Sequence, residues 1–172
     1  MKIIEADESH IAYLADFGST SFIHAYQCTL PLQELQKYIK IAFSEATLRE
    51  EINGSLATYF ICEDPGQAPC GYAKLISSPP PSCLHATSGI ELQRLYVASA
   101  YRGQGVGRLL MSHAESYARK RHRGDLWLRV WDGNVVARDI YAQWGFATVG
   151  RELYQVGEEQ RTVLVMGKSL DV

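Results

Sequence analysis

The sequence predicts a single α/β domain with a mixed central sheet of about seven strands flanked by helices. Three observations favour this fold. Apolar residues recur at a helical period before residue 53, and runs rich in β-branched and aromatic residues follow up to residue 77. Strand and helix patterns then alternate from residue 90 to the last strands. The 172 residues fit one domain of ordinary size and contain no linker or internal repeat.

The first third of the chain is predicted to be mainly helical. Residues 2–5 indicate a short strand, and residues 11–23 have the apolar spacing of a helix. A second helix is expected to start at Pro31, because proline suits the first helical position. A third, short helix over 45–52 should end at Asn53-Gly54, a common helix stop.

Strands follow in the middle of the chain. Residues 56–64 and 70–77 indicate a hairpin around Pro65-Gly66. Three prolines at 79–81 open a loop that runs to about residue 89, and a strand is expected over 90–97.

The last part of the chain alternates strands and helices. An amphipathic helix begins at Val106, after a glycine cluster, and a strand over 126–131 and a helix over 135–144 follow. The crossover by the first of these helices predicts at least one parallel strand pair. Two final strands, 146–156 and 161–168, flank a turn at Gly157.

Composition and charge exclude several functional classes. Seventeen Lys and Arg residues against nineteen Asp and Glu residues give a net charge of −2, so a general nucleic-acid binder is not expected. The four cysteines lack zinc-ligand spacing and are expected to be free thiols, with no metal site. The N-terminus has no signal-peptide pattern and no apolar run is long enough for a membrane span, so a cytoplasmic location without membrane contact is expected.

The turn before the amphipathic helix has the features of an anion site. Gly103, Gly105 and Gly107 lack Cβ atoms, which allows several backbone N–H groups to point at one anion beside the positive end of the helix dipole. A phosphate or pyrophosphate is the expected ligand. The spacing fits neither a P-loop nor a dinucleotide fingerprint. A glycine-rich turn without a ligand remains the alternative.

The same stretch resembles a known family. RGQGVG, residues 102–107, looks like the Arg/Gln-x-x-Gly-x-Gly/Ala signature of the GNAT superfamily of acetyl-CoA-dependent N-acetyltransferases, and WDGNVVARDIYAQWGF, residues 131–146, resembles the family's later helix. The resemblance covers residues 90–169. It implies the GNAT-like acyl-CoA N-acyltransferase fold, with one N-acetyltransferase domain over residues 1–172, an acetyl-CoA-binding core at 90–147 and acetyl-CoA as co-substrate.

The resemblance also implies roles for the matched positions. One group of residues would bind the coenzyme: Leu95, Tyr96 and Val97 the pantetheine amides, the backbone N–H groups of Arg102, Gly103, Gln104, Gly105, Val106, Gly107 and Arg108 the pyrophosphate, and Asn134 the pantetheine arm. Arg138 lies near enough in the sequence to assist. Tyr141 would reach the thioester sulfur as the proton donor, and its alternative is a packed aromatic residue.

Glu91 is the candidate general base. It precedes Leu95 by four residues, and this even offset predicts that both side chains lie on one face of the strand. Its position matches the glutamate base of histone-acetylating relatives. Many small-molecule relatives carry glutamate at the position of Gln93, which departs from that pattern. An ordinary strand-end carboxylate is the alternative for Glu91.

The expected reaction is transfer of the acetyl group to a primary amine by direct attack in a ternary complex. A route through an acetylated Cys28 or Cys83 is the competing mechanism. Residues 17–52 resemble the helical region of bacterial polyamine (spermidine/spermine) N-acetyltransferases, which favours a polyamine or diamine acceptor. The acids in that region, Glu34, Glu45, Glu50 and Glu51, either attract a polycation or form a solvated face.

Two other functions remain open at this stage. One is acetylation of a protein N-terminus or lysine, and the other is a non-catalytic acetyl-CoA-binding module. The apolar final strands are compatible with a homodimer.

Overall fold

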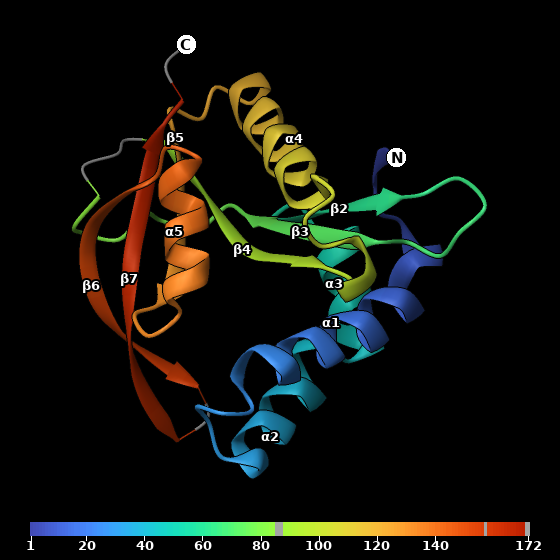
Figure 1. The fold of residues 1–172 in the computed structure, drawn as a ribbon, viewed down its shortest axis with the longest axis horizontal. Coiled ribbons are helices and arrows are strands. Elements are labelled where there is room, and N and C mark those ends of the chain that lie inside the picture. Colours follow the sequence, from blue (N-terminus) through green and yellow to red (C-terminus); the bar gives the residue numbers. More distant parts are fainter. Residues whose placement is uncertain (85–87, 157, 171–172) are drawn as a thin grey trace.

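A twisted sheet of seven strands forms the centre of the computed structural model, which describes residues 1–84, 88–156 and 158–170 (Figure 1). The strands lie in the order β1-β2-β3-β4-β5-β7-β6, and β4 and β5 run parallel while their neighbours pair antiparallel. The predicted mixed sheet is therefore confirmed. Its strands are β1 (Lys2–Glu5), β2 (Ala57–Glu63), β3 (Gly71–Ile76), β4 (Gly89–Val97), β5 (Asp125–Trp131), β6 (Ala147–Val156) and β7 (Glu159–Ser169).

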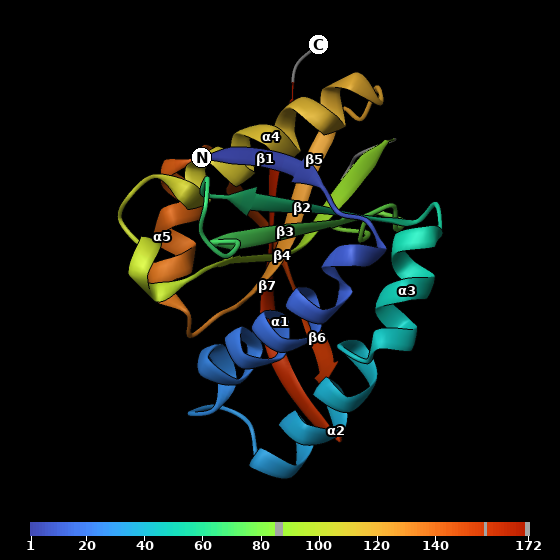
Figure 2. The ribbon, with the colours of Figure 1, turned by 90° about the vertical axis from the view of Figure 1, so that its right-hand side faces the viewer.

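Helices cover both faces of the sheet (Figure 2). One face packs against α1 and α3, and the other against α4 and α5. The helices are α1 (Ile11–Tyr26), α2 (Leu32–Ala42), α3 (Glu45–Asn53), α4 (Val106–Lys120) and α5 (Val135–Gln143). As predicted, α4 makes the crossover between the parallel strands.

Element bounds agree with the sequence expectations to within about two residues, with one informative difference. Pro31 precedes α2 instead of being its first residue, because its ψ of 140° is extended. The turn expected at Gly157 lies outside the described residues.

Two apolar clusters hold the helices to the sheet. On one face Leu110 and Met111 of α4 are fully buried against strand residues that include Leu92. On the other face, Leu14 and Tyr72 belong to a second cluster between α1, α3 and the sheet. Each fully buried side chain of this size contributes about 1.5–3 kcal/mol. The two clusters therefore fix the sheet rigidly between its helices.

The β6–β7 hairpin is tied to the N-terminal helices at its far end. The buried carboxylate of Glu34 on α2 accepts hydrogen bonds from Lys37 Nζ and from the backbone N–H of Glu158, each 2.7 Å long. Arg161 Nη2 of β7 donates to the carbonyl of Thr29, also at 2.7 Å. These contacts join segments more than 120 residues apart and hold the hairpin over the loop between α1 and α2.

Gly18 allows α1 to pack closely against the following helix. A Cβ at this position would lie 2.5 and 2.7 Å from two ring carbons of Phe43, closer than such atoms approach in proteins. The Phe43 ring in turn lies 4.1 Å from the guanidinium carbon of Arg94 on β4. Glycine at residue 18 thus sets the distance between α1 and a side chain that supports the sheet.

We expect Gly18→Ala to lower the free energy of unfolding by about 1–3 kcal/mol, because overpacking displaces the Phe43 ring. At an exposed helical position the same change would stabilise by about 1 kcal/mol. Thr20→Ala, on an exposed site of the same helix, is the control and should change stability by less than about 0.5 kcal/mol. Urea unfolding of the unmodified protein and the two variants measures the free energy of unfolding. Unchanged stability in Gly18→Ala would mean that the helix shifts freely.

Candidate functional site

The parallel strands β4 and β5 separate shortly after they begin. Their pairing covers Gly89, Ile90 and Glu91, whereas β4 continues along β3 to Val97 and β5 continues along β7. Figure 2 shows the two strands running apart. The edge of β4 that faces β5 therefore has no strand partner beyond Glu91 in the described structure. Leu95, Tyr96 and Val97 lie on this free edge, where a ligand can pair as an added strand.

The turn that leads from β4 into α4 presents unpaired backbone donors. None of the N–H groups of Gly103, Gly105, Val106, Gly107 and Arg108 donates to an acceptor among the described residues. Gly103 and Gly105 have φ angles of +74° and +84°, which L side chains rarely adopt. Together with the N-terminal end of the α4 dipole, these donors form a site for an anion. Gln104 braces the turn through a 2.7 Å bond from its side chain to the carbonyl of Ala100.

Gly107 has a different role from the other two glycines. A Cβ at this position would lie 3.3 Å from the Trp144 ring at the end of α5, so glycine permits the two helices to approach. The guanidinium of Arg108 lies 5.8 Å from the same ring.

Two further arginines donate hydrogen bonds to backbone carbonyls. Arg102 donates to the carbonyl of Val97 at 3.4 Å, which keeps its charge beside the free edge of β4. Arg138 instead donates to the carbonyl of Asp132, before α5, at 2.7 Å.

Helix α5 contributes two further polar groups. Asn134 caps it, because its Oδ1 accepts from the N–H of Ala137 at 3.1 Å, and this bond fixes the orientation of the side chain. Tyr141 packs edge-on against Trp144 and Phe146, at 5.9 Å from each ring. Burial raises the pKa of the Tyr141 phenol above its usual value, and Tyr26 adds to the effect. The phenol therefore stays protonated and can donate a proton or a hydrogen bond.

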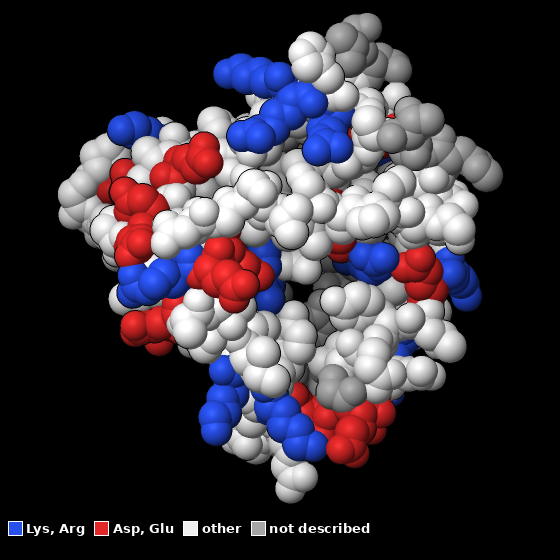
Figure 3. All heavy atoms as spheres, turned by 180° about the vertical axis from the view of Figure 1, so that it is seen from behind, with Lys and Arg blue, Asp and Glu red and all other residues white. Residues whose placement is uncertain are grey.

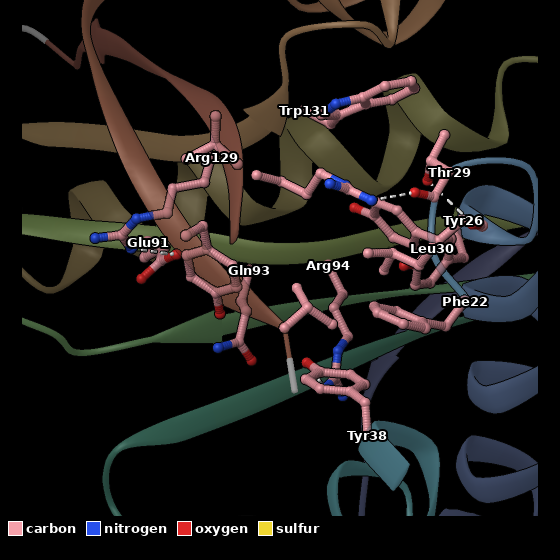
Figure 4. A pocket seen from close by; sticks show the side chains of 15 residues that line it. Phe22, Tyr26, Thr29, Leu30, Tyr38, Glu91, Gln93, Arg94, Arg129 and Trp131 are labelled. Carbon is pink, nitrogen blue, oxygen red and sulfur yellow. Dashed lines mark hydrogen bonds and ion pairs between the residues drawn. The ribbon is translucent and has the colours of Figure 1, made fainter. Parts of the chain in front are cut away.

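A narrow pocket of about 80 Å³ lies between the N-terminal helices and the strands β4, β5, β6 and β7 (Figure 4). Aromatic residues that include Phe22, Tyr26 and Trp131 form much of its wall. Its charged residues are Glu91 and three arginines, Arg94, Arg129 and Arg161. It is an apolar slot with a few fixed polar groups, the usual composition of a small-molecule site.

Glu91 is buried in this wall and has two partners. The residue is 4% exposed, and the carboxylate accepts from Arg129 Nη1 and from Ser78 Oγ, both at 3.0 Å. Arg129 also bonds Glu152 of β6 at 2.9 Å. The arginine thus links the wall formed by β4 to the hairpin and holds Glu91 in one orientation.

The expectation that Glu91 and Leu95 share a face is wrong. The register of β4 against β3 shifts at this point, since Leu92 lies opposite Leu75 and Arg94 lies opposite Lys74. Gln93 is the extra residue of a β-bulge, which reverses the alternation of side chains. Glu91 therefore lies on the pocket face and Leu95 on the α4 face.

The bulge also brings Arg94, which the sequence analysis did not consider, into the pocket beside Gln93 in the chain. Gln93 and Arg94 are consecutive, yet both line it, together with Arg129 of β5. A charged residue inside the apolar run LQRLYV was the available signal for Arg94. No sequence pattern indicates the bulge, which depends on the partner strand.

Among the described residues, no group of three or more His, Cys, Asp or Glu side chains is placed to hold a metal ion. No described helix is long and apolar enough to cross a membrane. On the face drawn in Figure 3, Lys and Arg residues are interspersed with Asp and Glu residues. This face therefore offers no broad basic surface to an anion.

The sequence model of the acetyltransferase (GNAT) family matches residues 21–146. The chain is 22% identical over 170 residues to an uncharacterized N-acetyltransferase in the pepI 3′ region of Lactobacillus delbrueckii subsp. lactis, across 99% of this chain and 98% of that protein. Streptothricin acetyltransferase of Streptomyces lavendulae is 43% identical over 68 residues, which are 38% of this chain and 36% of that enzyme.

A solved structure shares the fold over nearly the whole chain. The PaiA N-acetyltransferase from Thermoplasma acidophilum, in complex with coenzyme A, superposes with a TM-score of 0.76 and 19% identity. The superposition covers 98% of this chain and 99% of that chain. At this identity the likeness concerns the fold alone.

We expect Arg129→Met to lower the free energy of unfolding at pH 7 by about 3 kcal/mol, because it leaves the Glu91 carboxylate buried without its cation. The double variant Glu91→Gln/Arg129→Met should recover part of that loss. Arg49→Met is the control, because Arg49 and Glu8 form an exposed pair worth less than about 1 kcal/mol. Chemical denaturation at pH 7 measures the free energy of unfolding of each variant and of the unmodified protein. Equal losses in the two single variants would mean that solvent compensates the Glu91 charge.

Proposed function

The chain belongs to the acetyltransferase (GNAT) family, and from this premise we propose that it transfers the acetyl group of acetyl-CoA to the primary amine of a small molecule by direct attack in a ternary complex. The family is one of acyltransferases that use acetyl-CoA, which confirms the expected enzyme class and co-substrate. The acceptor class and the roles of individual residues are the proposal.

The strongest support is the arrangement of five unpaired N–H groups next to the free edge of β4. Acetyl-CoA carries a pyrophosphate, which needs several donors, and a pantetheine arm with amides that can pair with a strand. We assign the residues from Arg102 to Arg108 to the pyrophosphate and Leu95, Tyr96 and Val97 to the pantetheine amides. Asn134 would contribute its Nδ2 group, since its Oδ1 already caps α5.

The proposed chemistry uses one acid and one base. The amine nitrogen attacks the thioester carbonyl carbon, so a C–N bond forms and the C–S bond breaks. Glu91 receives the proton that the amine loses, and Tyr141 gives its proton to the departing sulfur. Two hydrogen bonds fix the Glu91 carboxylate, whose four lone-pair positions leave room for a further contact with the amine.

The positions of the cysteines support direct attack over a covalent acetyl-cysteine. Cys62 and Cys70 are buried, and burial raises the pKa of Cys62 to about 12, which disfavours a nucleophilic thiolate. Neither Cys28 nor Cys83 belongs to the wall of the pocket.

The resemblance of residues 17–52 favours a polyamine acceptor, but the pocket adds no support. Glu34 forms an ion pair with Lys37, and Glu51 forms one with Lys74. None of the four acids of this region lines the pocket. The short match to streptothricin acetyltransferase supports a small-molecule acceptor in general.

Two alternative functions are acetylation of a protein N-terminus or lysine, and a non-catalytic role in binding acetyl-CoA. Release of coenzyme A from acetyl-CoA with a panel of amines, compared with a binding titration, separates them.

We expect Tyr141→Phe to lower kcat about 100-fold with little change in the KM for acetyl-CoA, because the variant keeps the packing and loses the proton donor. Release of coenzyme A measures the rate. Tyr117→Phe is the matched control, since the Tyr117 hydroxyl contacts Thr58 and lies outside the pocket. Full turnover of Tyr141→Phe with normal acetyl-CoA affinity would rule out the acid role.

We expect Glu91→Gln to lower kcat/KM for the amine about 100-fold at pH 7. The deficit should shrink towards pH 10, because an alkylamine with a pKa near ~10.4 then supplies its own free base. Glu45→Gln, on the exposed side of α3, is the control. A deficit that stays constant from pH 7 to 10 would mean that Glu91 supports the wall and does not accept the proton.

A further inference from the structure

Two polar atoms in the wall of the pocket have no partner. Gln93 Oε1 and Arg94 Nη1 are buried, and neither makes a hydrogen bond within the described structure. Both residues line the pocket, and Figure 4 shows the Arg94 side chain running towards Tyr38. Buried polar groups in folded proteins nearly always have partners. A donor and an acceptor left open in one pocket therefore indicate a ligand that supplies both partners.

The β-bulge explains how these consecutive residues reach the same pocket. In a regular strand, neighbours point to opposite faces, and either Gln93 or Arg94 would point towards α4. The register shift opposite Lys74 and Leu75 places both on the pocket side. Bulges are common next to active sites, where they redirect side chains.

Arg94 is a buried cation without a carboxylate partner. The residue is 7% exposed, its Nη2 donates to Tyr38 Oη at 3.1 Å, and the Phe43 ring lies against it at 4.1 Å. No carboxylate of the described residues lies within 4.0 Å of its guanidinium. Arginine stays protonated in proteins, so this charge is present in the free pocket.

The neighbourhood of Arg94 has more positive charge than its carboxylates can pair. Lys74 lies opposite Arg94 in the sheet and is also buried. Its Nζ forms an ion pair with Glu51 Oε1 at 2.6 Å. Burial lowers the pKa of Lys74 to about 8, and the Arg94 charge adds to the effect. Glu91, which acts in the opposite direction on Lys74, is held by Arg129.

The other two arginines of the pocket differ from Arg94 in this respect. Arg129 is paired with Glu91 and Glu152, and Arg161 is paired with Glu159 and bonded to the carbonyl of Thr29. Only Arg94, among the pocket arginines in the described structure, keeps both an unpaired charge and a free donor.

We infer that the acceptor is a small primary amine that also carries a carboxylate. This inference rests on the proposed N-acetyltransferase function and narrows its substrate class. The carboxylate accepts from Arg94 Nη1 and neutralises the guanidinium, and the amine donates to Gln93 Oε1 on the way to Glu91. A polycation, in contrast, would meet the unpaired charge of Arg94. The narrow aromatic slot suits the carbon chain between the two groups better than a bulky anion.

The test compares amino acids with the amines that lack only the carboxylate. Ornithine is set against putrescine, 4-aminobutyrate against propylamine, and the remaining L-amino acids against their decarboxylated amines, with spermidine included. We expect kcat/KM to be about 100-fold higher for the carboxylated member of the preferred pair. Arg94→Met should remove this preference while the KM for acetyl-CoA stays unchanged.

Two controls keep the result interpretable. Arg121→Met removes an exposed arginine at the end of α4 and should retain the preference. Circular dichroism and acetyl-CoA titration establish that Arg94→Met is folded. The pairwise comparison in the unmodified protein needs no variant, and calorimetric titration of its coenzyme A complex with each pair member reports binding without turnover.

Each outcome bears on one of the two proposals. Equal or better use of putrescine, propylamine or spermidine overturns the carboxylate inference and leaves the N-acetyltransferase function intact. A folded Arg94→Met protein that keeps the preference also overturns it, as does a failure of every carboxylated member to bind. Binding of a carboxylated amine that depends on Arg94, without release of coenzyme A, supports the inference and contradicts the proposed function.

Discussion

The separation of β4 from β5 after three paired residues is the constraint on which the rest of this structure depends. Backbone groups on a strand edge must find partners, and the described structure leaves those on the outer part of β4 without a strand partner. β5 pairs with β7 along its whole length and leaves β4 after Trp127, and β7 carries the β6–β7 hairpin towards α2. The same event therefore opens the edge of β4 and builds the wall of the pocket. The glycine turn follows β4 and α5 follows β5, so the residues that we propose for the cofactor and the acceptor come from the elements around that opening.

Local groups, and not overall charge, determine what the site can bind. A net charge of −2 excludes a broad basic surface, yet five unpaired N–H groups at the start of α4 form an anion site that carries no formal charge. Charged side chains in the pocket follow the same principle. Arg129 is neutralised by Glu91 of β4 and Glu152 of β6, and Arg161 by Glu159 of its own strand, whereas Arg94 has no such partner among the described residues. The distribution of partners within a few ångströms decides the chemistry, and composition does not report it.

Much of the fold, including the turn that we propose as the coenzyme site, could be predicted because its signals are local. Helix and strand bounds follow from side-chain periodicity, and the turn before α4 needs glycines where φ is positive, at Gly103 and Gly105. The role of Gly107 could not be predicted, since it depends on contact with Trp144 of another helix. The face of Glu91 was predicted wrongly for a related reason. Counting alternate residues assumes a regular strand, and the extra residue at Gln93 appears only when β4 is aligned with β3.

The sequence by itself determined the order of the elements, the mixed sheet with its parallel crossover, and the family to which the motifs of residues 102–107 and 131–146 belong. These properties depend on periodicity and on short-range turn chemistry, which neighbouring residues encode. Only the tertiary structure decided which charges are paired and which face of β4 lines the pocket. Those properties arise from contacts between segments far apart in the chain, such as Glu91 with Arg129 and Thr29 with Arg161. The strength of an ion pair or hydrogen bond depends on the distance between its partners. When the partners lie far apart in the chain, that distance cannot be read from a local sequence pattern.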